Sequence, residues 1–250
     1  YAVFLKMLSK RFKTKFDATS IDEFVGEFKQ TMPGYPCPST PTVYRYIDRG
    51  LLDISNIDLP MKLKRRRNKR HHSHGGHAPH KKNLGNSIEQ RPKEVEDRAT
   101  PLHWEGDWVK GVRRKNQPAL MTLTERTTRF EIVIKIPDYR ASTCQRLLQK
   151  EIDQHPDWFK TITFDNGSEF ADMTKIKNCQ IYFAHPYSPW ERGTNENCNG
   201  LLRQFFPKGK SMSDKTAAYV QQATNAINHK HRRILQYHTA EELFKQYISS

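Results

Sequence analysis

Residues 101–137 contain three successive segments with the side-chain alternation of β-strands, and this pattern limits the fold most. The segments read WEGDWVKG (104–111), PALMTLTERTTRF (118–130) and EIVIKIP (131–137), and a turn is expected near residues 127–129. β-Branched and aromatic residues dominate them, as is typical of strands on a half-buried surface. Strands joined in this way have to bury a face against helices. The pattern therefore predicts a sheet at the core of this region.

The residues after this meander alternate between helix and strand patterns. ASTCQRLLQKEIDQH is expected to be a helix capped by Ser142 or Thr143, and TITFD (161–165) and QIYFAH (180–185) are short buried strands. A helical region starts near Gly193 and reaches about Phe206, and residues 213–232 form another amphipathic helix with Ser213 as its cap. The fold class that follows is α/β, with a mixed five-stranded sheet.

The first 60 residues are predicted to be helical. Ser20 and Glu23 form a capping box at the start of a helix that ends near residue 31. A second helix begins at residues 39–40, ends at Gly50 and presents Arg45 and Arg49 outward. Two short helices with a basic second member indicate a DNA-reading helix-turn-helix. The alternative is an ordinary helical hairpin, because the turn is longer than usual.

Residues 61–98 are expected to link this region to a catalytic domain over residues 99–250. The linker begins MKLKRRRNKR and continues HHSHGGHAPHKK. A cationic arm of this kind can follow a phosphate backbone, although a merely solvated linker has the same composition. The basic residues expected to contact DNA here are Lys64, Arg65, Arg66 and Arg67.

The charge of the chain favours a polyanionic partner. Lys and Arg number 42 against 27 Asp and Glu, a formal net charge of +15, and the pI is about 9.7. DNA or RNA is the first candidate, and a basic protein without such a partner is the alternative. No apolar run is long enough to cross a bilayer, so no membrane partner is expected. Four cysteines without a CxxC pair fit reduced thiols in the cytoplasm.

Three carboxylates stand where a metal-dependent nuclease would need them. Asp107 lies within a strand, Asp165 closes a buried strand, and Glu196 lies in the first turn of a helix. Hard divalent cations prefer oxygen ligands, and two such ions can bind the attacking and the leaving oxygen when a phosphodiester is cleaved. Each residue alone also has a simpler interpretation: an edge-strand Asp in water, a turn-forming Asp, or a Glu that complements the helix dipole. Their rivals by proximity are Glu105, Glu169 and Glu191.

The motifs around these carboxylates resemble a known family. WEGD, LTERTTRF, TFDNGSEF and FAHPYSPWERGTNENCNGLLRQFFPKG look like the transposases of the IS-thirty family of insertion sequences. That family belongs to the DDE superfamily, together with retroviral integrases and ribonuclease H. The resemblance covers residues from about 85 to the end, and STPTVYRYIDRGLL resembles the helix-turn-helix region that precedes the catalytic domain. It implies a ribonuclease-H-like catalytic domain.

The resemblance also implies roles for individual residues. Asp107, Asp165 and Glu196 would be the catalytic triad and would hold two divalent ions, Mg²⁺ or Mn²⁺. The ions would activate water to cut at the transposon end, and the freed 3′-OH would then attack target DNA. Arg192 and Arg203 stand where relatives place basic residues, and we expect them to contact DNA.

The expected activity is that of a DNA transposase that binds terminal inverted repeats and cleaves and transfers DNA strands. Its partner would be double-stranded DNA, both transposon ends and target, and a homodimer or larger assembly would hold two ends together. The protein would be cytoplasmic in a bacterium and nucleoid-associated when bound to DNA. The first alternative is a non-catalytic, transposon-derived DNA-binding regulator. The second is a plain ribonuclease H or nuclease, which the basic arm and Arg45 or Arg49 as base-edge readers disfavour. Asn195, Asn197 and Asn199 are expected to orient water or DNA.

Overall fold

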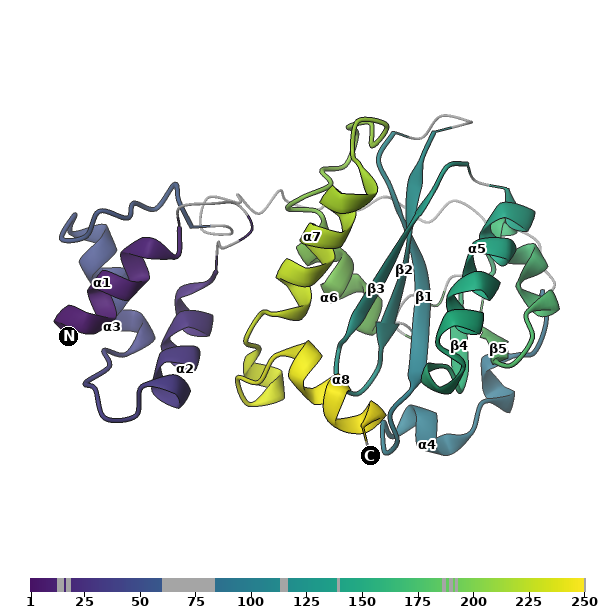
Figure 1. Ribbon diagram of the computed structural model, residues 1–250, viewed down its shortest axis with the longest axis horizontal. Helices are drawn as coiled ribbons and strands as arrows, with labels where there is room; N and C mark the ends of the chain where they lie inside the picture. Colours follow the sequence, from purple (N-terminus) through teal and green to yellow (C-terminus); the bar gives the residue numbers. More distant parts are fainter. Residues whose placement is uncertain are drawn as a thin grey trace, which may run out of the picture. The chain divides into compact units, whose positions relative to one another are not determined.

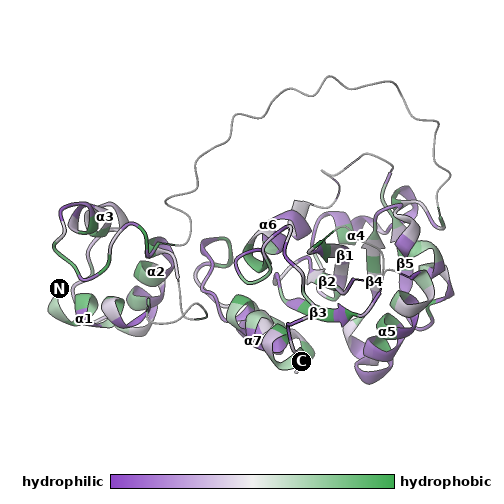
Figure 2. Cartoon of the chain, turned by 90° about the horizontal axis from the view of Figure 1, so that it is seen from above, coloured by the Kyte–Doolittle hydropathy of each residue, from purple (hydrophilic) through white to green (hydrophobic). Residues whose placement is uncertain are grey.

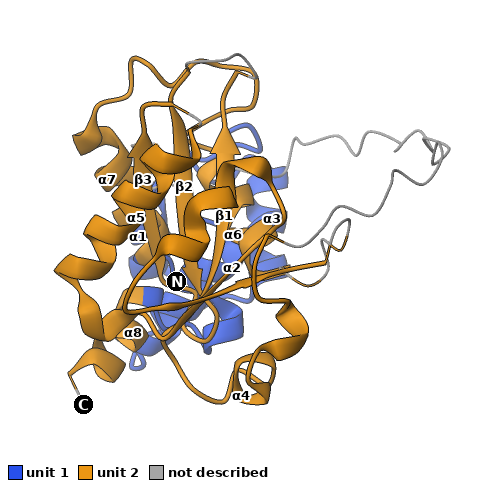
Figure 3. Ribbon diagram, turned by 90° about the vertical axis from the view of Figure 1, so that its right-hand side faces the viewer, with its two compact units in different colours: residues 1–77, 229–240 blue, residues 78–228, 241–250 orange. Residues whose placement is uncertain are grey.

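A computed structural model describes most of the chain, which divides into two compact units. The described residues are 1–12, 16, 19–59, 84–112, 117–138, 140–185, 188, 191 and 193–249. One unit contains residues 1–77 and 229–240, and the other contains residues 78–228 and 241–250 (Figure 3). The predicted boundaries at 60/61 and 98/99 stay predictions. Five of the residues expected to contact DNA lie outside the described residues: Lys64, Arg65, Arg66, Arg67 and Arg192.

The smaller unit is built on three helices around an aromatic core. They are α1 (Ala2–Lys10), α2 (Ile21–Thr31) and α3 (Thr40–Asp48). The predicted capping box is confirmed, because the Ser20 hydroxyl accepts from Glu23 N and the Glu23 carboxylate accepts from Ser20 N. Phe4 packs edge-on against Phe24 and Phe28 at 5.1 Å between ring centroids. Burial of these rings supplies the apolar area that a small unit needs.

Helix α3 follows the sequence pattern closely. It begins after Ser39 with a proline in its first turn, and Gly50 adopts a φ of 65° just beyond its end. A positive φ is readily available only to glycine, so the helix stops there. Val43 and Ile47 are buried while Arg45 and Arg49 are exposed. Two guanidinium groups one turn apart therefore project into solvent from one helix.

A segment from the end of the chain completes the smaller unit. Within residues 229–240, Lys230 Nζ lies 3.6 Å from Glu23 Oε2, and the Tyr237 hydroxyl donates to Asp22 Oδ2 at 3.2 Å. The Tyr237 ring also lies where a Cβ on Gly26 would be, so the absence of a side chain at this position of α2 lets the ring approach the helix. Basic and aromatic residues of the segment thus meet the acidic side of α2.

The larger unit contains the predicted mixed five-stranded sheet (Figure 1). Its strand order is β3-β2-β1-β4-β5, in which β2 pairs antiparallel with β1 and β3, and β4 pairs parallel with β1 and β5. The strands are β1 (His103–Lys110), β2 (Ala119–Glu125), β3 (Glu131–Ile136), β4 (Thr161–Phe164) and β5 (Gln180–Phe183).

Helices cover both faces of this sheet (Figure 1). On one side lie α5 and the short helix η3, and on the other side α6 contacts β1 and β2 while α7 contacts β3. A further helix, α8, follows near the end of the chain. The bounds are α5 (Ala141–Gln154), η3 (Ser168–Lys175), α6 (Gly193–Leu202), α7 (Ala217–Asn228) and α8 (Ala240–Ile248).

The ends of three helices differ from the prediction. Helix α5 begins at Ala141 with Arg140 at its N-cap, so neither Ser142 nor Thr143 caps it. Helix α6 ends at Leu202, four residues before the expected Phe206, and tight turns follow it. Helix α7 begins later than expected, at Ala217, where the Thr216 hydroxyl accepts from Tyr219 N at 3.1 Å, and it ends at Asn228, before the expected residue 232.

Residues 84–98 pack against the β5 edge of the sheet. They form η1 (Ile88–Gln90) and α4 (Lys93–Glu96). Ser87 bridges Phe183 in parallel, and Phe183 N donates to Asn86 O at 2.8 Å. The Arg91 guanidinium donates to Thr163 Oγ1 of β4 at 3.1 Å. This stretch therefore covers an edge that would otherwise present unpaired backbone groups.

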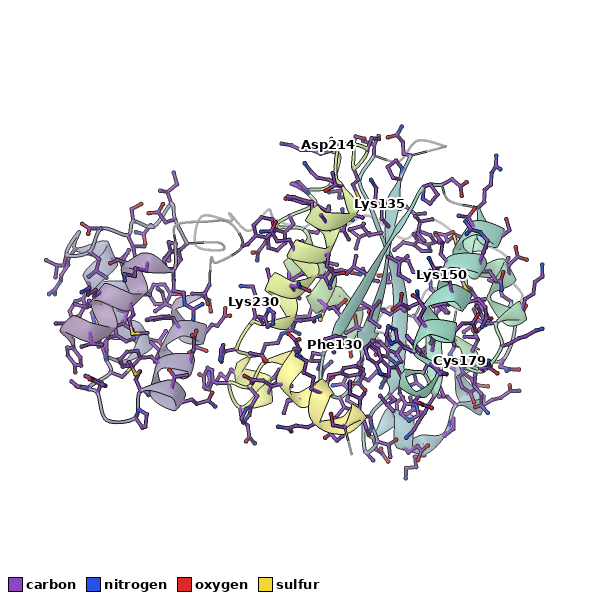
Figure 4. The ribbon with its side chains drawn as sticks, in the orientation of Figure 1. Phe130, Lys135, Lys150, Cys179, Asp214 and Lys230 are labelled. Carbon is purple, nitrogen blue, oxygen red and sulfur yellow. The ribbon has the colours of Figure 1, made fainter. Side chains whose placement is uncertain are left out.

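The two faces of the sheet differ sharply in polarity. The face under α5 is apolar and carries Trp104, Gly106 and Trp108 of β1 with their neighbours on β2 and β4. Figure 2 shows hydrophobic (green) residues on strands of the sheet and on the helices that pack against it. Phe130, labelled in Figure 4, stacks on Phe244 of α8 at 4.3 Å and extends this core. The core explains why the strands alternate so regularly in sequence.

The opposite face carries buried polar residues in a row across four strands. Register pairs Thr163 of β4 with Glu105 of β1, Glu105 with Thr124 of β2, and Thr124 with Glu131 of β3. None of the four is more than 1% exposed. Buried polar groups have to be hydrogen-bonded, and here Arg91, Arg126 and helix α6 supply partners. This requirement decides how α6 is placed.

At one end of the larger unit, the loop before α7 contacts strand β3. Lys135 on β3 and Asp214 in the loop before α7 lie near each other at one end of the unit (Figure 4), and the Lys135 ammonium donates to Lys215 O.

All four cysteines are free thiols. Within the described residues no helix is both long and apolar enough to cross a membrane.

A methyl group at Gly106 should destabilise the larger unit. Its Cβ would lie 2.0 Å from Cε1 of the buried Phe164 ring. Overpacking of this kind costs about 1–3 kcal/mol, and we expect Gly106→Ala to lower the unfolding free energy in urea by that amount. Gly200→Ala is the control, because a Cβ there meets open space on a helix and should be neutral or stabilising by up to about 1 kcal/mol. Equal effects of both changes would contradict this packing.

Stability should fall in mild acid because of His103. This ring is buried between Thr100 and Thr161, each 2.9 Å from one of its nitrogens. Burial, followed by the charge of Lys160, lowers the pKa of His103 from 6.5 to about 4. Between these values the unfolded chain binds the proton and the folded chain does not, so the unfolding free energy decreases as pH falls.

The expected loss between pH 6.5 and pH 4 is at most about 3 kcal/mol from this residue. Urea titrations across that range measure it, with His103→Gln as the comparison because glutamine keeps polar atoms but does not titrate. A variant with the same pH dependence as the parent chain would exclude His103 as the cause.

Candidate active site

The sheet brings Asp107 and Asp165 to neighbouring positions. Strands β1 and β4 are parallel, and their register pairs Glu105 with Thr163. The pairing ends there, and the same register extended by two residues would set Asp107 beside Asp165, which follows the last residue of β4. Adjacent strands lie about 5 Å apart, and residues two apart on a strand share a face. The two carboxylates therefore project from adjacent backbones on the polar face, near the carboxyl ends of both strands.

Glu196 reaches the same neighbourhood through α6. Asn199 lies one turn later on this helix, and its Nδ2 donates to Asp107 Oδ2 at 2.7 Å. Residues three apart on a helix have Cβ atoms about 5–6 Å apart, so Glu196 stands close to the residue that contacts Asp107. Its side chain is exposed and makes no hydrogen bond or ion pair with another described residue.

The Asp107 carboxylate has a polar environment set by three elements. The Thr122 hydroxyl of β2 donates to Asn199 Oδ1 at 3.1 Å, which leaves the Asn199 amide NH₂ directed at Asp107. Arg203 lies just after α6, and its Nη1 donates to Lys110 O at 2.7 Å. Burial lowers the pKa of Arg203, and the charge of Asp107 opposes that shift. A negative charge at Asp107 is thus balanced from the α6 side.

The carboxylates are not gathered into a single cluster in this arrangement. Among the residues that the structure describes, no three Asp, Glu, His or Cys side chains lie close enough together to hold a metal ion. Asp107 is turned toward Asn199, while Asp165 Oδ1 accepts from Gly167 N at 2.9 Å. Like charges at short range repel, so ionised carboxylates converge more readily when a cation lies between them. Their chemistry as a donor set suits a hard divalent cation.

The three rival carboxylates each have a basic or histidine partner. Glu105 Oε1 accepts from Arg126 Nη1 at 2.8 Å, and Glu169 Oε1 accepts from Lys110 Nζ at 2.8 Å. Glu191 accepts from His185 N at 2.9 Å and lies 2.8 Å from its Nδ1, and this contact raises the pKa of His185. Each is therefore committed to holding a strand or loop in place.

The asparagines of α6 divide between roles. Asn199 contacts Asp107, whereas Asn195 is 1% exposed and its Oδ1 accepts from Thr124 Oγ1 at 2.5 Å. Asn197 is exposed. Orientation of water or DNA was expected for all three, but Asn195 faces the sheet and serves to attach the helix. The reason is helical spacing, since residues 195 and 199 lie on one face and residue 197 on the other.

Two site-supporting residues were not recognised in the sequence. Thr122 and Thr124 carry the contacts from β2 to α6. The signal was present in MTLTE, where two hydroxyls alternate with apolar residues in an otherwise buried strand. A buried hydroxyl needs a partner, so this alternation indicates a polar element packed on that face.

The chain is similar in sequence to known DNA-processing proteins. Residues 97–189 match the integrase core domain family, a span that includes Asp107 and Asp165. The chain is 38% identical over 242 residues to the probable transposase for insertion-like sequence element IS1161 of Streptococcus salivarius. It is 31% identical over 255 residues to the transposase for insertion sequence element IS4351 of Bacteroides fragilis. It is also 31% identical over 169 residues to the transposase InsI for insertion sequence element IS30A of Escherichia coli.

These matches define an integrase-type DNA-processing core. The aligned regions cover 97% of this chain and 69% of the Streptococcus protein, 98% and 72% for the Bacteroides protein, and 66% and 43% for the Escherichia protein. The chain belongs to the insertion-sequence transposases of the DDE superfamily, which are polynucleotidyl transferases. Divalent-metal dependence is general for this class of core, and its substrate is DNA.

Proposed function

We propose that the chain is a transposase of the IS-thirty family that binds the terminal inverted repeats of its element. Asp107, Asp165 and Glu196 are its catalytic carboxylates and hold two divalent ions, Mg²⁺ or Mn²⁺. The observation that carries the proposal is their placement on adjacent strands and on the helix that contacts Asp107. The likeness to the Escherichia transposase for IS30A, which extends over two thirds of the chain, supports the family.

The three carboxylates would converge from the polar face of the sheet when cations bind. Asp107 would contact a cation while its Oδ2 keeps the hydrogen bond from Asn199, and Glu196 has no other described partner to give up. Divalent ions in such a site lower the pKa of water and stabilise a departing oxygen. Asn199, fixed by Thr122, then keeps the Asp107 carboxylate oriented, as outer hydrogen bonds commonly do for ligands.

The smaller unit supplies DNA recognition in this proposal. Arg45 and Arg49 project from α3 one turn apart, which suits contact with base edges in a major groove. The net charge of +15 favours association with the phosphate backbone. A homodimer or larger assembly on double-stranded DNA would hold two transposon ends, and the work would take place in the bacterial cytoplasm at the nucleoid.

Neutral isosteres of the three carboxylates should abolish end cleavage. Asp107→Asn, Asp165→Asn and Glu196→Gln each keep the side-chain size but lose the charge that holds a cation. Loss of outer contacts alone costs about 10–100-fold, so we expect a fall of more than about 100-fold. The measurement is cleavage of a labelled duplex that carries the element's end, in Mg²⁺ and in Mn²⁺.

Asp172→Asn is the matched control, because this carboxylate pairs with Lys175 in η3 away from the site. It should cleave at nearly the parental rate. Retention of cleavage in all three test variants would refute the catalytic assignment. A parental chain that binds the end but never cleaves it would favour the regulator instead.

Loss of the α3 guanidinium groups should weaken binding to the terminal repeats specifically. We expect Arg45→Ala and Arg49→Ala to reduce affinity for repeat DNA by about 5–100-fold each, since a bidentate base contact contributes about 1–3 kcal/mol. Affinity for random duplex should change less. Gel shifts on both duplexes at fixed salt measure this, with Lys29→Ala in the last turn of α2 as the control. Equal losses of affinity for both duplexes would show that the α3 arginines contact the phosphate backbone and do not read bases.

A further inference from the structure

We propose that Glu105 is a positioning residue that fixes the first turn of α6, and thereby Glu196, relative to Asp107. The inference rests on the proposed catalytic role of Glu196. Glu105 lies two residues before Asp107 on the same face of β1. Its Oε2 accepts from the backbone N–H of Asn195 at 3.2 Å, the residue directly before Glu196. One strand thus carries a catalytic carboxylate and the anchor of the helix that carries another.

Both oxygens of Glu105 are used. Oε1 accepts from Arg126 Nη1 at 2.8 Å, and Oε2 accepts from Asn195 N. Glu105 is 1% exposed and Arg126 is 3% exposed. A buried carboxylate with a single partner would be costly, whereas this one joins a guanidinium and a helix start. The guanidinium fixes the carboxylate, and the carboxylate fixes the helix.

The backbone contact has a specific physical purpose. The first turn of a helix has amide N–H groups without partners inside the helix, and its end carries partial positive charge. Asn195 is the third residue of α6, so its amide is one of those groups. A carboxylate usually caps a helix from the residue before it. Here the carboxylate comes from the sheet, so capping also sets the distance between helix and strand.

Two other contacts hold the same turn through side chains. Arg98 Nη2 donates to Thr194 Oγ1 at 3.1 Å, and Thr124 Oγ1 donates to Asn195 Oδ1. These contacts depend on side-chain rotamers. Among the described contacts of this turn with the sheet, Glu105 makes the one that reaches the helix backbone and carries a charge. Its loss would let the turn move while the rest of α6 stays attached at Asn199.

The test compares Glu105→Ala and Glu105→Gln with Glu125→Gln. Hydrogen exchange is measured in the metal-free chain, and end cleavage is measured at increasing Mn²⁺ concentration. Glu125 is a matched control: it is fully buried, and its carboxylate accepts from Thr127 N and Thr128 Oγ1 in the β2–β3 turn, on the other face of the sheet. Amide hydrogen exchange is read by mass spectrometry on peptides from the first turn of α6 and from α7. Thermal unfolding is followed for each variant.

A positioning role predicts faster exchange in the first turn of α6 by about tenfold or more for Glu105→Ala, because a hydrogen bond to a charged group is lost. Exchange in α7 should stay at the parental rate. Glu105→Gln keeps the size and one acceptor, so its effect should be smaller. The Mn²⁺ concentration for half-maximal end cleavage should rise by about 10-fold or more in Glu105→Ala. Glu125→Gln should change neither quantity, although it lowers thermal stability.

The outcomes separate this inference from the proposed function. If the Glu105 variants leave both quantities unchanged while Glu196→Gln is inactive, the positioning role is wrong and the catalytic assignment stands. If Glu196→Gln cleaves normally, the catalytic assignment fails and the inference falls with it. Faster exchange throughout the unit, α7 included, would reveal general destabilisation and overturn the inference. If Glu105→Ala does not fold, the isosteric Glu105→Gln decides by the same local readout.

Discussion

The buried ion pair between Glu105 and Arg126 sets a condition that much of the larger unit meets. Charge on the interior face of a sheet requires partners on every side. Arg126, which directly follows β2, donates to Glu105, and so does the backbone amide of Asn195 in α6. Thr163, in the same row, takes its partner from Arg91. The opposite face buries mainly aliphatic and aromatic side chains, whose packing is non-directional and stabilises the sheet without requiring particular hydrogen-bond partners.

Much of the fold was accessible from sequence because its strands are amphipathic. The alternation in WEGDWVKG and MTLTE predicted β1 and β2, and the buried runs before Asp165 and His185 predicted β4 and β5. Helix ends were less accessible. Several hydroxyls near residues 142 and 213 could act as caps, but Arg140 precedes α5 without a side-chain cap bond, and the Thr216 hydroxyl accepts from the first turn of α7. Helix α1 lies in the region predicted to be helical, but its bounds were not predicted, and its burial against Phe24 and Phe28 depends on distant residues.

The candidate site divides in the same way. The sequence alone predicts the three candidate carboxylates, because motif and local pattern coincide at Asp107, Asp165 and Glu196. It does not predict their relation, since this depends on parallel register between β1 and β4 and on the side of α6 that meets β2. The roles of Asn195 and Asn199 also differ for this reason. A sequence pattern shows that the two share a helix face, but only the packed sheet shows which acceptor each one meets.

The contacts that complete the site join residues far apart along the chain. Asp107 and Asn199 are 92 residues apart, and Glu105 and Asn195 are 90 apart. Closing loops of that length costs entropy before any contact forms, so such contacts arise late in folding. The hairpins of β1, β2 and β3 need no such closure. On the proposed assignment of Glu196, we therefore expect the sheet to form first during synthesis, and catalytic competence to arrive with α6.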